Sequence, residues 1–455
     1  MAVEWRNVSI EDIASKIAMG PFGSDIKTDN FVHAGVPVIR GGNLTSGRFH
    51  GAGFVFLTEE KADELANANA FPGDLVFTHR GTLGQIGLVP AAPFKRYVVS
   101  QSQMKLRCDP KSADPTFIYY FFRSPAGQHA LLMNTSQTGV PAISRPTTSL
   151  KSIRLPLPPL PEQRAIAHIL GTLDDKIELN RRMNETLEAI ARALFKSWFV
   201  DFDPVRAKAK GPAGQDDQVS AMRQGGRVFW PTDPGLPKPL ADLFTDFFED
   251  SELGEIPRGW RLGSVDDEFD LTMGQSPPGE TYNEAGVGLP FYQGCTDFGF
   301  RFPTRRIYCT APTRLGKAGD TLVSVRAPVG DINMATENCA IGRGVAAVRH
   351  KTGSRSYSYQ FMKSIKEVFA RFEAEGTVFG SIGKKDFHAI ACVNPPRELV
   401  LAYEARVSPL DDRVEVNERE SRTLAALRDT LLPKLISGEL RVRDAPRSAQ
   451  EAPVC

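Results

Sequence analysis

The chain carries one charged, helix-forming phrase twice, and this repetition limits its possible folds more than any other feature does. The phrase is LDDKIELNRR at residues 173–182 and LDDRVEVNER at residues 410–419. Six of the ten positions are identical, and three of the four changes keep the character of the side chain. Similarity at a long, fixed interval is the signature of a duplicated structural unit. A chain of this kind is expected to contain two similar domains.

Further blocks recur in the same order, which predicts an internal duplication of the whole half-chain. GDLVFTHRGTLGQIG (73–87) corresponds to GDTLVSVRAPVGDIN (319–333), and VPVIRGG (36–42) corresponds to LPFYQGC (289–295). FIYYFFRS (117–124) corresponds to YSYQFMKS (357–364), and TGVPAIS (138–144) to TVFGSIG (377–383). Chance similarity would not preserve this order. The length of 455 residues also favours two or more domains.

Proline-rich breakers divide each half into a globular part and a helical part. The first globular part is rich in glycine, proline and short β-branched or aromatic runs, which predicts an α+β domain. LPLPPLP (155–161) then interrupts regular structure, and a helical pattern follows to about Phe199. The predicted organisation is a first globular domain (1–155), a first helical region (156–203), a linker (204–253), a second globular domain (254–396), a second helical region (397–440) and a flexible tail (441–455).

Residues at intervals of seven in both helical regions predict a coiled-coil seam. The seam residues are Ile166, Leu173, Ile177, Asn180, Leu187 and Leu194 in the first region, and Leu410, Val414, Asn417, Leu424 and Leu431 in the second. A stripe this short also fits a helix packed on its own domain. The two asparagines either find partners across the seam and fix its register, or point to solvent at its edge. The neighbouring charges of the first phrase, Asp174 among them, are expected to form a solvated face. Their recurrence in the second phrase, which includes Asp411, indicates a surface used twice, for two copies of one partner.

The two helical regions have the length of a spacer. A helix of about 38 residues, at roughly 1.5 Å per residue, is about 57 Å long. Packed antiparallel, two such helices would hold the globular domains apart and relate them by an approximate two-fold axis. That length corresponds to at most some 17 base pairs at about 3.4 Å each. The expected fold class is therefore α+β: two similar α+β domains separated by two long helices that form an antiparallel coiled coil, with an internal pseudo-two-fold repeat.

No catalytic motif is found along the chain. GSIGKK (380–385) lacks the spacing of a phosphate loop, and NPPR (394–397) has Arg397 where DNA amino-methyltransferases carry an aromatic residue. The six cysteines lack metal-ligand spacing, which also favours a reducing cytoplasm. No apolar run reaches the roughly 18–20 residues that cross a bilayer. We therefore predict no catalytic residue, no metal, no cofactor bound by this chain, no membrane association and a cytoplasmic location.

The order of these blocks resembles the specificity subunit of type I restriction–modification systems. The resemblance covers nearly the whole chain, and its most specific part is the PLPEQ, LDDKIELN and ALFKSWF series within 155–205. It implies that the globular domains are target recognition domains, each for half of a bipartite, asymmetric sequence in double-stranded DNA. It further implies that the helices fix the gap and dock two methyltransferase subunits, which endonuclease/translocase subunits join. S-adenosylmethionine, ATP and Mg²⁺ would then belong to those partners.

The second helical region departs from the family pattern. LLPKLISGEL stands where the first region has LFKSWFVDF, so the second docking surface is less well defined by the resemblance.

Reading DNA bases requires polar or basic side chains on loops that can enter the major groove. Residues 1–161 hold 16 Lys and Arg against 12 Asp and Glu, and residues 254–396 hold 17 against 15, which is compatible with phosphate contacts. Each candidate is either a base reader or an ordinary surface or phosphate-contacting residue. The candidates are Arg40, Asn43, His79, Arg80, Gln101, Gln103, Thr138 and Arg145 in the first domain, and Gln275, Gln293, Arg326, Arg343, Ser381, Lys384 and Lys385 in the second.

The aromatic residues of FIYYFFRS are expected to pack in the core, with a base-stacking platform as the alternative. For the whole chain, the leading hypothesis is a non-catalytic DNA-recognition subunit that gives its partner enzymes their specificity. The alternatives are a specificity subunit of a methylation-only system and a self-sufficient DNA-modifying enzyme whose site is unrecognised.

Overall fold

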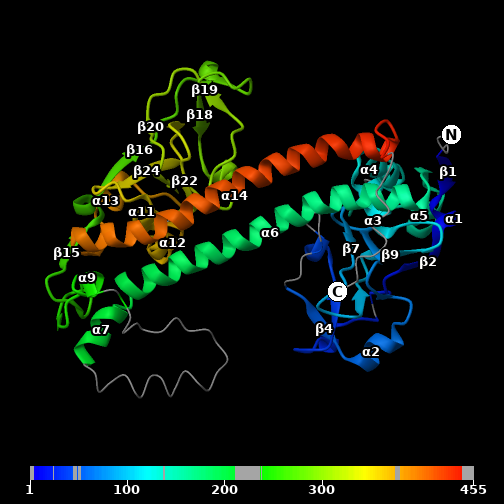
Figure 1. The fold of residues 1–455 in the computed structure, drawn as a ribbon, viewed down its shortest axis with the longest axis horizontal. Helices are drawn as coiled ribbons and strands as arrows, with labels where there is room; N and C mark the ends of the chain where they lie inside the picture. Colours follow the sequence, from blue (N-terminus) through cyan, green and yellow to red (C-terminus); the bar gives the residue numbers. More distant parts are fainter. Residues whose placement is uncertain are drawn as a thin grey trace. The chain divides into compact units, whose positions relative to one another are not determined.

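The computed structural model describes residues 5–23, 25–44, 49, 53–136, 139–210, 236, 238–374 and 380–442. The chain forms two compact units. Unit 1 comprises Met1–Leu179 and Glu420–Cys455, and unit 2 comprises Asn180–Arg419. Both boundaries fall inside long helices, α6 (Leu160–Phe199) and α14 (Arg397–Ser437), so each unit contains a part of each helix (Figure 1).

Unit 1 contains two four-stranded sheets. The first is antiparallel, in the order β2 (Ala14–Met19), β9 (Gln103–Cys108), β6 (Leu75–Thr78) and β7 (Ile86–Leu88). The second has the order β4 (Val55–Leu57), β3 (Val36–Ile39), β8 (Tyr97–Val99) and β5 (Asn69–Ala70), with β3 and β8 parallel. Smaller antiparallel pairs are β1 (Arg6–Ser9) with β12 (Arg154–Leu157) and β10 (Thr135–Ser136) with β11 (Ala142–Ile143). The shorter helices are α1 (Ile10–Ile13), α2 (Glu59–Glu64), α3 (Pro115–Arg123), α4 (Pro125–Leu132) and α5 (Pro146–Ser152).

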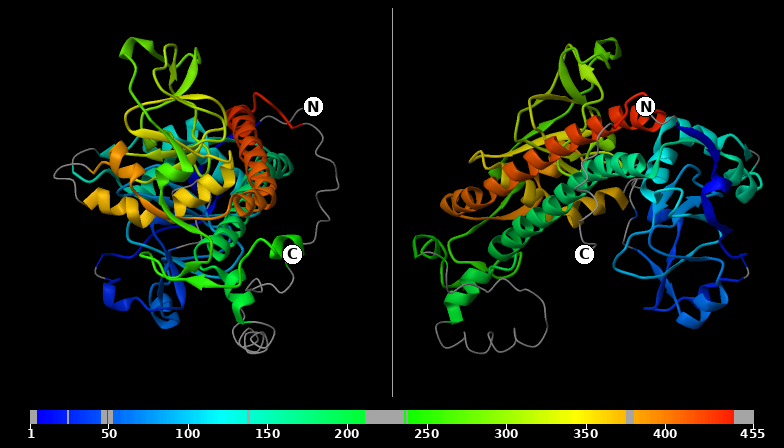
Figure 2. Two further views of the ribbon diagram at one scale, coloured as in Figure 1. Left: turned by 90° about the vertical axis from the view of Figure 1, so that its left-hand side faces the viewer. Right: turned by 45° about the vertical axis from the view of Figure 1, so that its right-hand side comes forward.

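Unit 2 likewise contains two sheets, one of four strands and one of five, in the part of the chain coloured green to yellow in Figure 2. One sheet has the order β16 (Phe269–Met273), β24 (Val345–His350), β21 (Thr321–Ser324) and β22 (Ile332–Met334). The other has the order β17 (Tyr282–Asn283), β19 (Tyr308–Cys309), β18 (Leu289–Tyr292), β23 (Cys339–Ile341) and β20 (Leu315–Gly316). Smaller pairs are β13 (Phe248–Glu249) with β14 (Ile256–Pro257) and β15 (Arg261–Ser264) with β25 (Ala391–Asn394). The shorter helices are α7 (Asp203–Lys210), α9 (Lys238–Ala241), α10 (Val265–Glu268), α11 (Arg355–Ser364), α12 (Lys366–Ala374) and α13 (Lys384–His388).

The strand pairings confirm the internal repeat that the sequence predicts. The parallel pair β3–β8 aligns Ile39 with Val99, and its counterpart β18–β23 aligns Tyr292 with Ile341. An ion pair between a buried aspartate and a half-exposed arginine is also duplicated. The guanidinium of Arg107 lies 2.7 Å from the Asp74 carboxylate in unit 1, and that of Arg349 lies 2.6 Å from Asp320 in unit 2.

The aromatic run of unit 1 forms α3 and belongs to the core. Asp114 caps the helix by accepting hydrogen bonds from the backbone amides of Thr116 (2.9 Å) and Phe117 (3.0 Å), and Pro115 occupies the first turn. All six residues from Phe117 to Phe122 are buried. Core packing is therefore the correct interpretation of FIYYFFRS, because its aromatic rings have no exposed face on which a base could stack.

Both long helices begin at a proline breaker, and both pack on their own globular domain as well as on each other. In unit 1, Ile166 and Leu170 of α6 share one buried cluster with Leu432 and Leu435 of α14 and with the domain core. In unit 2, Phe195 of α6 lies in a cluster with Leu399 and Val407 of α14. The apolar stripe therefore has both roles that the sequence allows: it forms the helix–helix seam, and it packs each helix on its own domain. In the seam, Leu173, Ile177, Leu187, Leu194, Leu410, Leu424 and Leu431 are half-buried, whereas Ile166 and Val414 are fully buried.

The seam asparagines of unit 2 are buried and hydrogen-bonded. Asn180 donates to the Asn417 carbonyl oxygen at 3.4 Å, and Asn417 donates to the side chain of Asn184 at 2.8 Å. Asn184 in turn donates to Glu418 at 3.0 Å. The solvent-facing alternative is wrong for both seam residues. Because a buried amide is costly without its partner, these contacts favour one register of α6 on α14.

Asp174 of α6 is buried in unit 1, so the expectation that it belongs to a solvated face is wrong. Its carboxylate accepts hydrogen bonds from the Tyr120 hydroxyl at 2.7 Å and from Arg428 of α14 at 2.6 Å. Arg123 of α3 lies 3.4 Å away. The physical reason for burial is that the domain and the second helix both supply donors to this carboxylate, which offsets its lost hydration.

Asp411, the counterpart of Asp174 in the repeated phrase, is likewise buried in unit 2. It forms an ion pair with Arg301, which also lies 3.0 Å from Glu188 of α6 and 3.7 Å from the centre of the Tyr359 ring. Lys363 completes the network at 2.8 Å from Glu188. Burial raises the pKa of Asp411 although the Arg301 charge opposes that shift. One arginine thus joins the domain to both helices.

We predict that Asp411→Ala lowers the free energy of unfolding by about 3–5 kcal/mol, because Arg301 keeps a buried charge without its main partner. Asp412→Ala is the matched control, since Asp412 is 63% exposed and pairs only at the surface with Arg355. Its loss should cost less than about 1 kcal/mol. Urea unfolding followed by tryptophan fluorescence measures both, because Trp198 and Trp260 lie in the unit 2 core. Equal losses in the two variants would contradict this account of the network.

Candidate nucleic-acid interface

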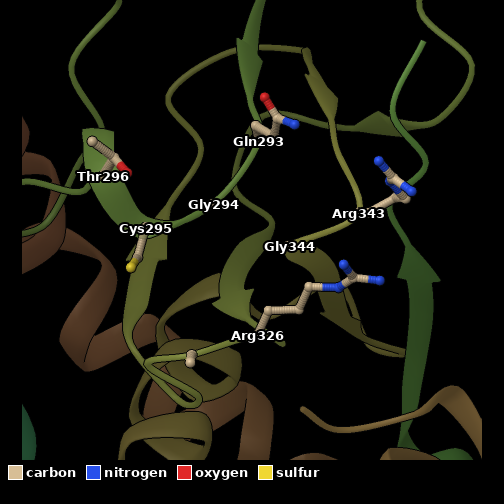
Figure 3. A pocket seen from close by; sticks show the side chains of 8 residues that line it. Gln293, Gly294, Cys295, Thr296, Arg326, Arg343 and Gly344 are labelled. Carbon is tan, nitrogen blue, oxygen red and sulfur yellow. The ribbon is translucent and has the colours of Figure 1, made fainter. Parts of the chain in front are cut away.

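A hollow of about 230 Å³ in unit 2 brings together three of the residues that the sequence singles out (Figure 3). These are Gln293, Arg326 and Arg343, all exposed. They come from three separate turns: Gln293 follows β18, Arg326 follows β21, and Arg343 lies between β23 and β24. The remaining lining residues are Gly294, Cys295, Thr296, Ala327 and Gly344.

Backbone hydrogen bonds hold the three turns against one another. The Gly342 amide donates to the Tyr292 carbonyl at 2.9 Å, and the Gly344 amide donates to the Gln293 carbonyl at 3.0 Å. The Val325 amide donates to the Gly344 carbonyl at 2.9 Å, which fastens the Arg326 turn to the same segment. The three polar side chains therefore project from a rigid frame at the ends of the strands.

Two glycines flank Arg343 and permit the close approach of its turn to Gln293. A Cβ at Gly342 would lie 2.9 Å from the Gln293 Cα, and a Cβ at Gly344 would lie 2.4 Å from the Gln293 carbonyl oxygen. The second contact is with backbone, which cannot turn away as a side chain can. Any larger residue at position 344 would push the Arg343 turn away from the hollow.

We predict that Gly344→Ala lowers the free energy of unfolding by about 1–3 kcal/mol, because the added methyl group overpacks this contact. Gly294→Ala is the matched control in the same hollow, where an added Cβ meets no atom within 4 Å. It should change the stability by less than about 0.5 kcal/mol. Urea unfolding of the full chain distinguishes the two. A stable Gly344→Ala variant would show that the turn does not need the close approach.

The other unit 2 candidates lie near the same strand ends. The Gln275 amide donates to the Ile341 carbonyl at 3.0 Å, beside the Arg343 turn. Ser381 forms an isolated antiparallel bridge with Arg326, and α13 begins three residues later with Lys384 and Lys385. All four side chains are exposed. The unit 2 candidates thus gather on one edge of the domain.

Unit 1 holds the corresponding positions with two of the same three hydrogen bonds. The Ser100 amide donates to the Ile39 carbonyl at 3.0 Å, and the His79 amide donates to the Ser102 carbonyl at 2.9 Å. These bonds place Arg40, Arg80 and Gln101 at the positions that Gln293, Arg326 and Arg343 occupy in unit 2. Arg80 also bridges Ala142, as Arg326 bridges Ser381. Each unit therefore presents one glutamine and two arginines, all exposed, in one backbone frame.

Three unit 1 candidates are buried, and the expectation that they face a partner is wrong. Asn43 accepts a hydrogen bond from the Arg40 amide at 2.9 Å, and it shapes the turn. Gln103 donates to Thr78 at 3.3 Å within the first sheet. His79 lies 3.2 Å from the Gln101 carbonyl, and burial lowers its pKa. Their side chains point inward because each follows the alternation of a strand or a tight turn.

Arg145 stands apart, and Thr138 lies outside the described residues. Arg145 adopts a left-handed backbone conformation (φ 45°) immediately before α5. It is exposed and borders a polar hollow of about 390 Å³ in unit 1, whose other lining residues are Asn134, Thr135, Ser144, Thr148, Ser149 and Ser152. Hydroxyl groups beside a guanidinium suit a phosphate oxygen better than a base edge.

Sequence reasoning missed Thr296 and Cys295 of the unit 2 hollow, and it also missed buried Arg301. One feature of the sequence points to the hollow: glycines on both sides of Arg343 indicate a tightly packed turn that presents a single charged side chain. No such sequence feature marks Arg301, because nothing in its local sequence distinguishes it from the exposed arginines near it.

Guanidinium and carboxamide groups on turns can form paired hydrogen bonds with base edges. No acidic residue lines the unit 2 hollow, so its two arginine charges remain available to an electron-rich partner. Within the described ranges, no helix is both long and apolar enough to cross a membrane. Nor do three or more His, Cys, Asp or Glu side chains gather there as a metal site would require.

Comparison with known proteins agrees with the resemblance. Residues 2–189 match the type I restriction modification DNA specificity domain. The chain is 27% identical over 446 residues to a Methanocaldococcus jannaschii protein assigned as the MjaX specificity subunit of a type I restriction enzyme, covering 97% of this chain and 94% of that protein. It is 24% identical to the HindI specificity subunit of Haemophilus influenzae, covering 96% of this chain and 100% of that protein.

A solved structure has the same fold. The type I restriction–modification S subunit from M. genitalium superimposes with a TM-score of 0.57 at 16% identity, covering 95% of this chain and 96% of that one. Two mixed helix-and-sheet domains joined by long helices are thus the fold that the sequence predicts. Residues 2–189 thus match the type I restriction modification DNA specificity domain, and over nearly its whole length the chain is similar to specificity subunits of type I restriction enzymes.

Proposed function

We propose that the chain is the DNA-recognition subunit of a type I restriction–modification complex, and that each unit reads one half of a bipartite, asymmetric target. The observation that carries the proposal is that each unit presents one glutamine and two arginines at its strand ends, on the same arrangement of backbone turns. Two copies of one frame suit two half-sites. Their different side-chain order suits two different half-sequences.

The complex would supply the chemistry and this chain the specificity. Methylation with S-adenosylmethionine belongs, in this proposal, to two methyltransferase subunits, and ATP-driven cleavage with Mg²⁺ belongs to endonuclease/translocase subunits. The long helices would set the gap between half-sites. The complex would act in the cytoplasm, on the host's double-stranded DNA.

Exposed apolar residues at equal places on the two long helices support docking of two copies of one partner. Leu179 of α6 is 52% exposed, and Val416 of α14 is 48% exposed. They occupy the same position of the repeated phrase, beside Asn180 and Asn417 respectively. A large apolar side chain exposed on a helix can anchor a protein interface.

We predict that exchanging residues 1–155 for the corresponding domain of another specificity subunit changes one half of the methylated sequence only. The other half of the methylated sequence should not change, because unit 2 keeps its own recognition residues. Sequencing of modified adenines in cells that carry the exchange, with and without the gene, reads out the target. A change in both halves would contradict modular recognition, and loss of a short continuous motif would indicate another architecture.

We predict that Leu179→Asp or Val416→Asp weakens capture of the methyltransferase subunit at least tenfold, since each places a charge in the apolar contact. Binding of DNA by the chain itself should be unaffected. Glu185→Lys is the control, because Glu185 of the same helix is exposed and pairs only with Arg181 at the surface. Size-exclusion chromatography with the partner subunit measures docking. Unchanged docking in both apolar variants would remove this surface from the proposal.

A further inference from the structure

The frame of each unit carries the same three side chains in a different order. In unit 1 the order is Arg40, Arg80, Gln101, and in unit 2 it is Gln293, Arg326, Arg343. We call these sets triad 1 and triad 2. The middle arginine is common to both, and the glutamine and the other arginine exchange places. The parallel strand pair beneath the three side chains is the same in both units.

Resting on the proposed recognition function, we propose that the triads are the base-reading side chains and that the exchange makes the target asymmetric. An arginine forms bidentate hydrogen bonds with O6 and N7 of guanine, and a glutamine forms them with N6 and N7 of adenine. Each half-site then contains two contacted G·C pairs and one contacted A·T pair. The A·T pair takes a different place in the two half-sites.

The surroundings of triad 2 suit base edges. Its side chains extend from three turns around one hollow (Figure 3). Among the described residues, neither Arg326 nor Arg343 pairs with a carboxylate, whereas Arg305, Arg306 and Arg349 of the same domain each do. A rigid frame reduces the entropy lost when a side chain is fixed on a base, and this favours selective contacts over a mobile phosphate contact.

Triad 1 is held with comparable rigidity. The Arg40 guanidinium donates to the Gly53 carbonyl at 3.0 Å, and its own amide donates to the buried Asn43 side chain. The backbone carbonyl of Gln101 lies against the His79 ring. The buried candidates of unit 1 thus act on the frame rather than on a base.

The charge-neutral test is the double exchange Gln293→Arg with Arg343→Gln, which gives unit 2 the side-chain order of unit 1. Net charge does not change, so non-specific binding and its salt dependence should stay the same. In the full chain assembled with its modification subunits, two positions of one half-site should exchange adenine and guanine. The other half-site and the gap should remain. The expected preference for the new half-site is about tenfold or more.

Arg261→Gln is the control, because Arg261 is exposed on β15, which pairs with β25 next to the start of α14 rather than with the strands of the hollow. It should leave the motif unchanged. Where the double exchange abolishes methylation, selection of bound sequences from a random duplex library by the purified chain gives the motif directly. The reciprocal exchange Arg40→Gln with Gln101→Arg should alter only the other half-site.

The outcomes separate the inference from the function on which it rests. A wild-type complex that methylates a bipartite motif, together with a double exchange that selects the same motif, would overturn the triads and leave the function intact. A wild-type complex with no bipartite motif would overturn both. A change confined to the two expected positions of one half-site supports both.

Discussion

One buried carboxylate on each long helix holds the parts of each unit together. Asp174 receives donors from the domain through Tyr120 and from the second helix through Arg428. Asp411 pairs with Arg301, which reaches Glu188 of the other helix. A charge in a low-dielectric interior must find partners, and here those partners come from different elements. In each unit a single buried aspartate thus belongs to a polar network that links the domain to both helices.

Local signals account for what the sequence predicts correctly in the fold. Proline at each breaker and a continuous helical pattern locate α6 and α14 to within a few residues, because both signals act within one element. The repeat follows from block order alone. The burial of Asp174 cannot be predicted from the sequence in this way, because the same charged phrase on an isolated helix would face water. Only contacts with α3 and α14 change that outcome, and no local pattern encodes them.

The candidate site also has features that the sequence predicts and features that it does not. Residue type suffices to select Arg326 and Arg343, but it also selects Asn43 and Gln103, which the structure buries. The difference lies in which turn each residue occupies, and that depends on the pairing of strands distant in sequence. The β18–β23 pair joins segments separated by about fifty residues. The correspondence of Gln101 with Arg343 becomes visible only through this pairing, since the surrounding sequences differ.

The division of both helices between the units has a consequence for synthesis on the ribosome. Unit 2 is one continuous segment, whereas unit 1 needs residues from both ends of the chain. Leu432, Leu435 and Ile436 complete the core of unit 1, and Arg441 lies against Trp5. These residues leave the ribosome after the whole of unit 2. Of the two domains, the one translated first is thus completed only after the other has been synthesised, and part of its core lacks its packing partners until then.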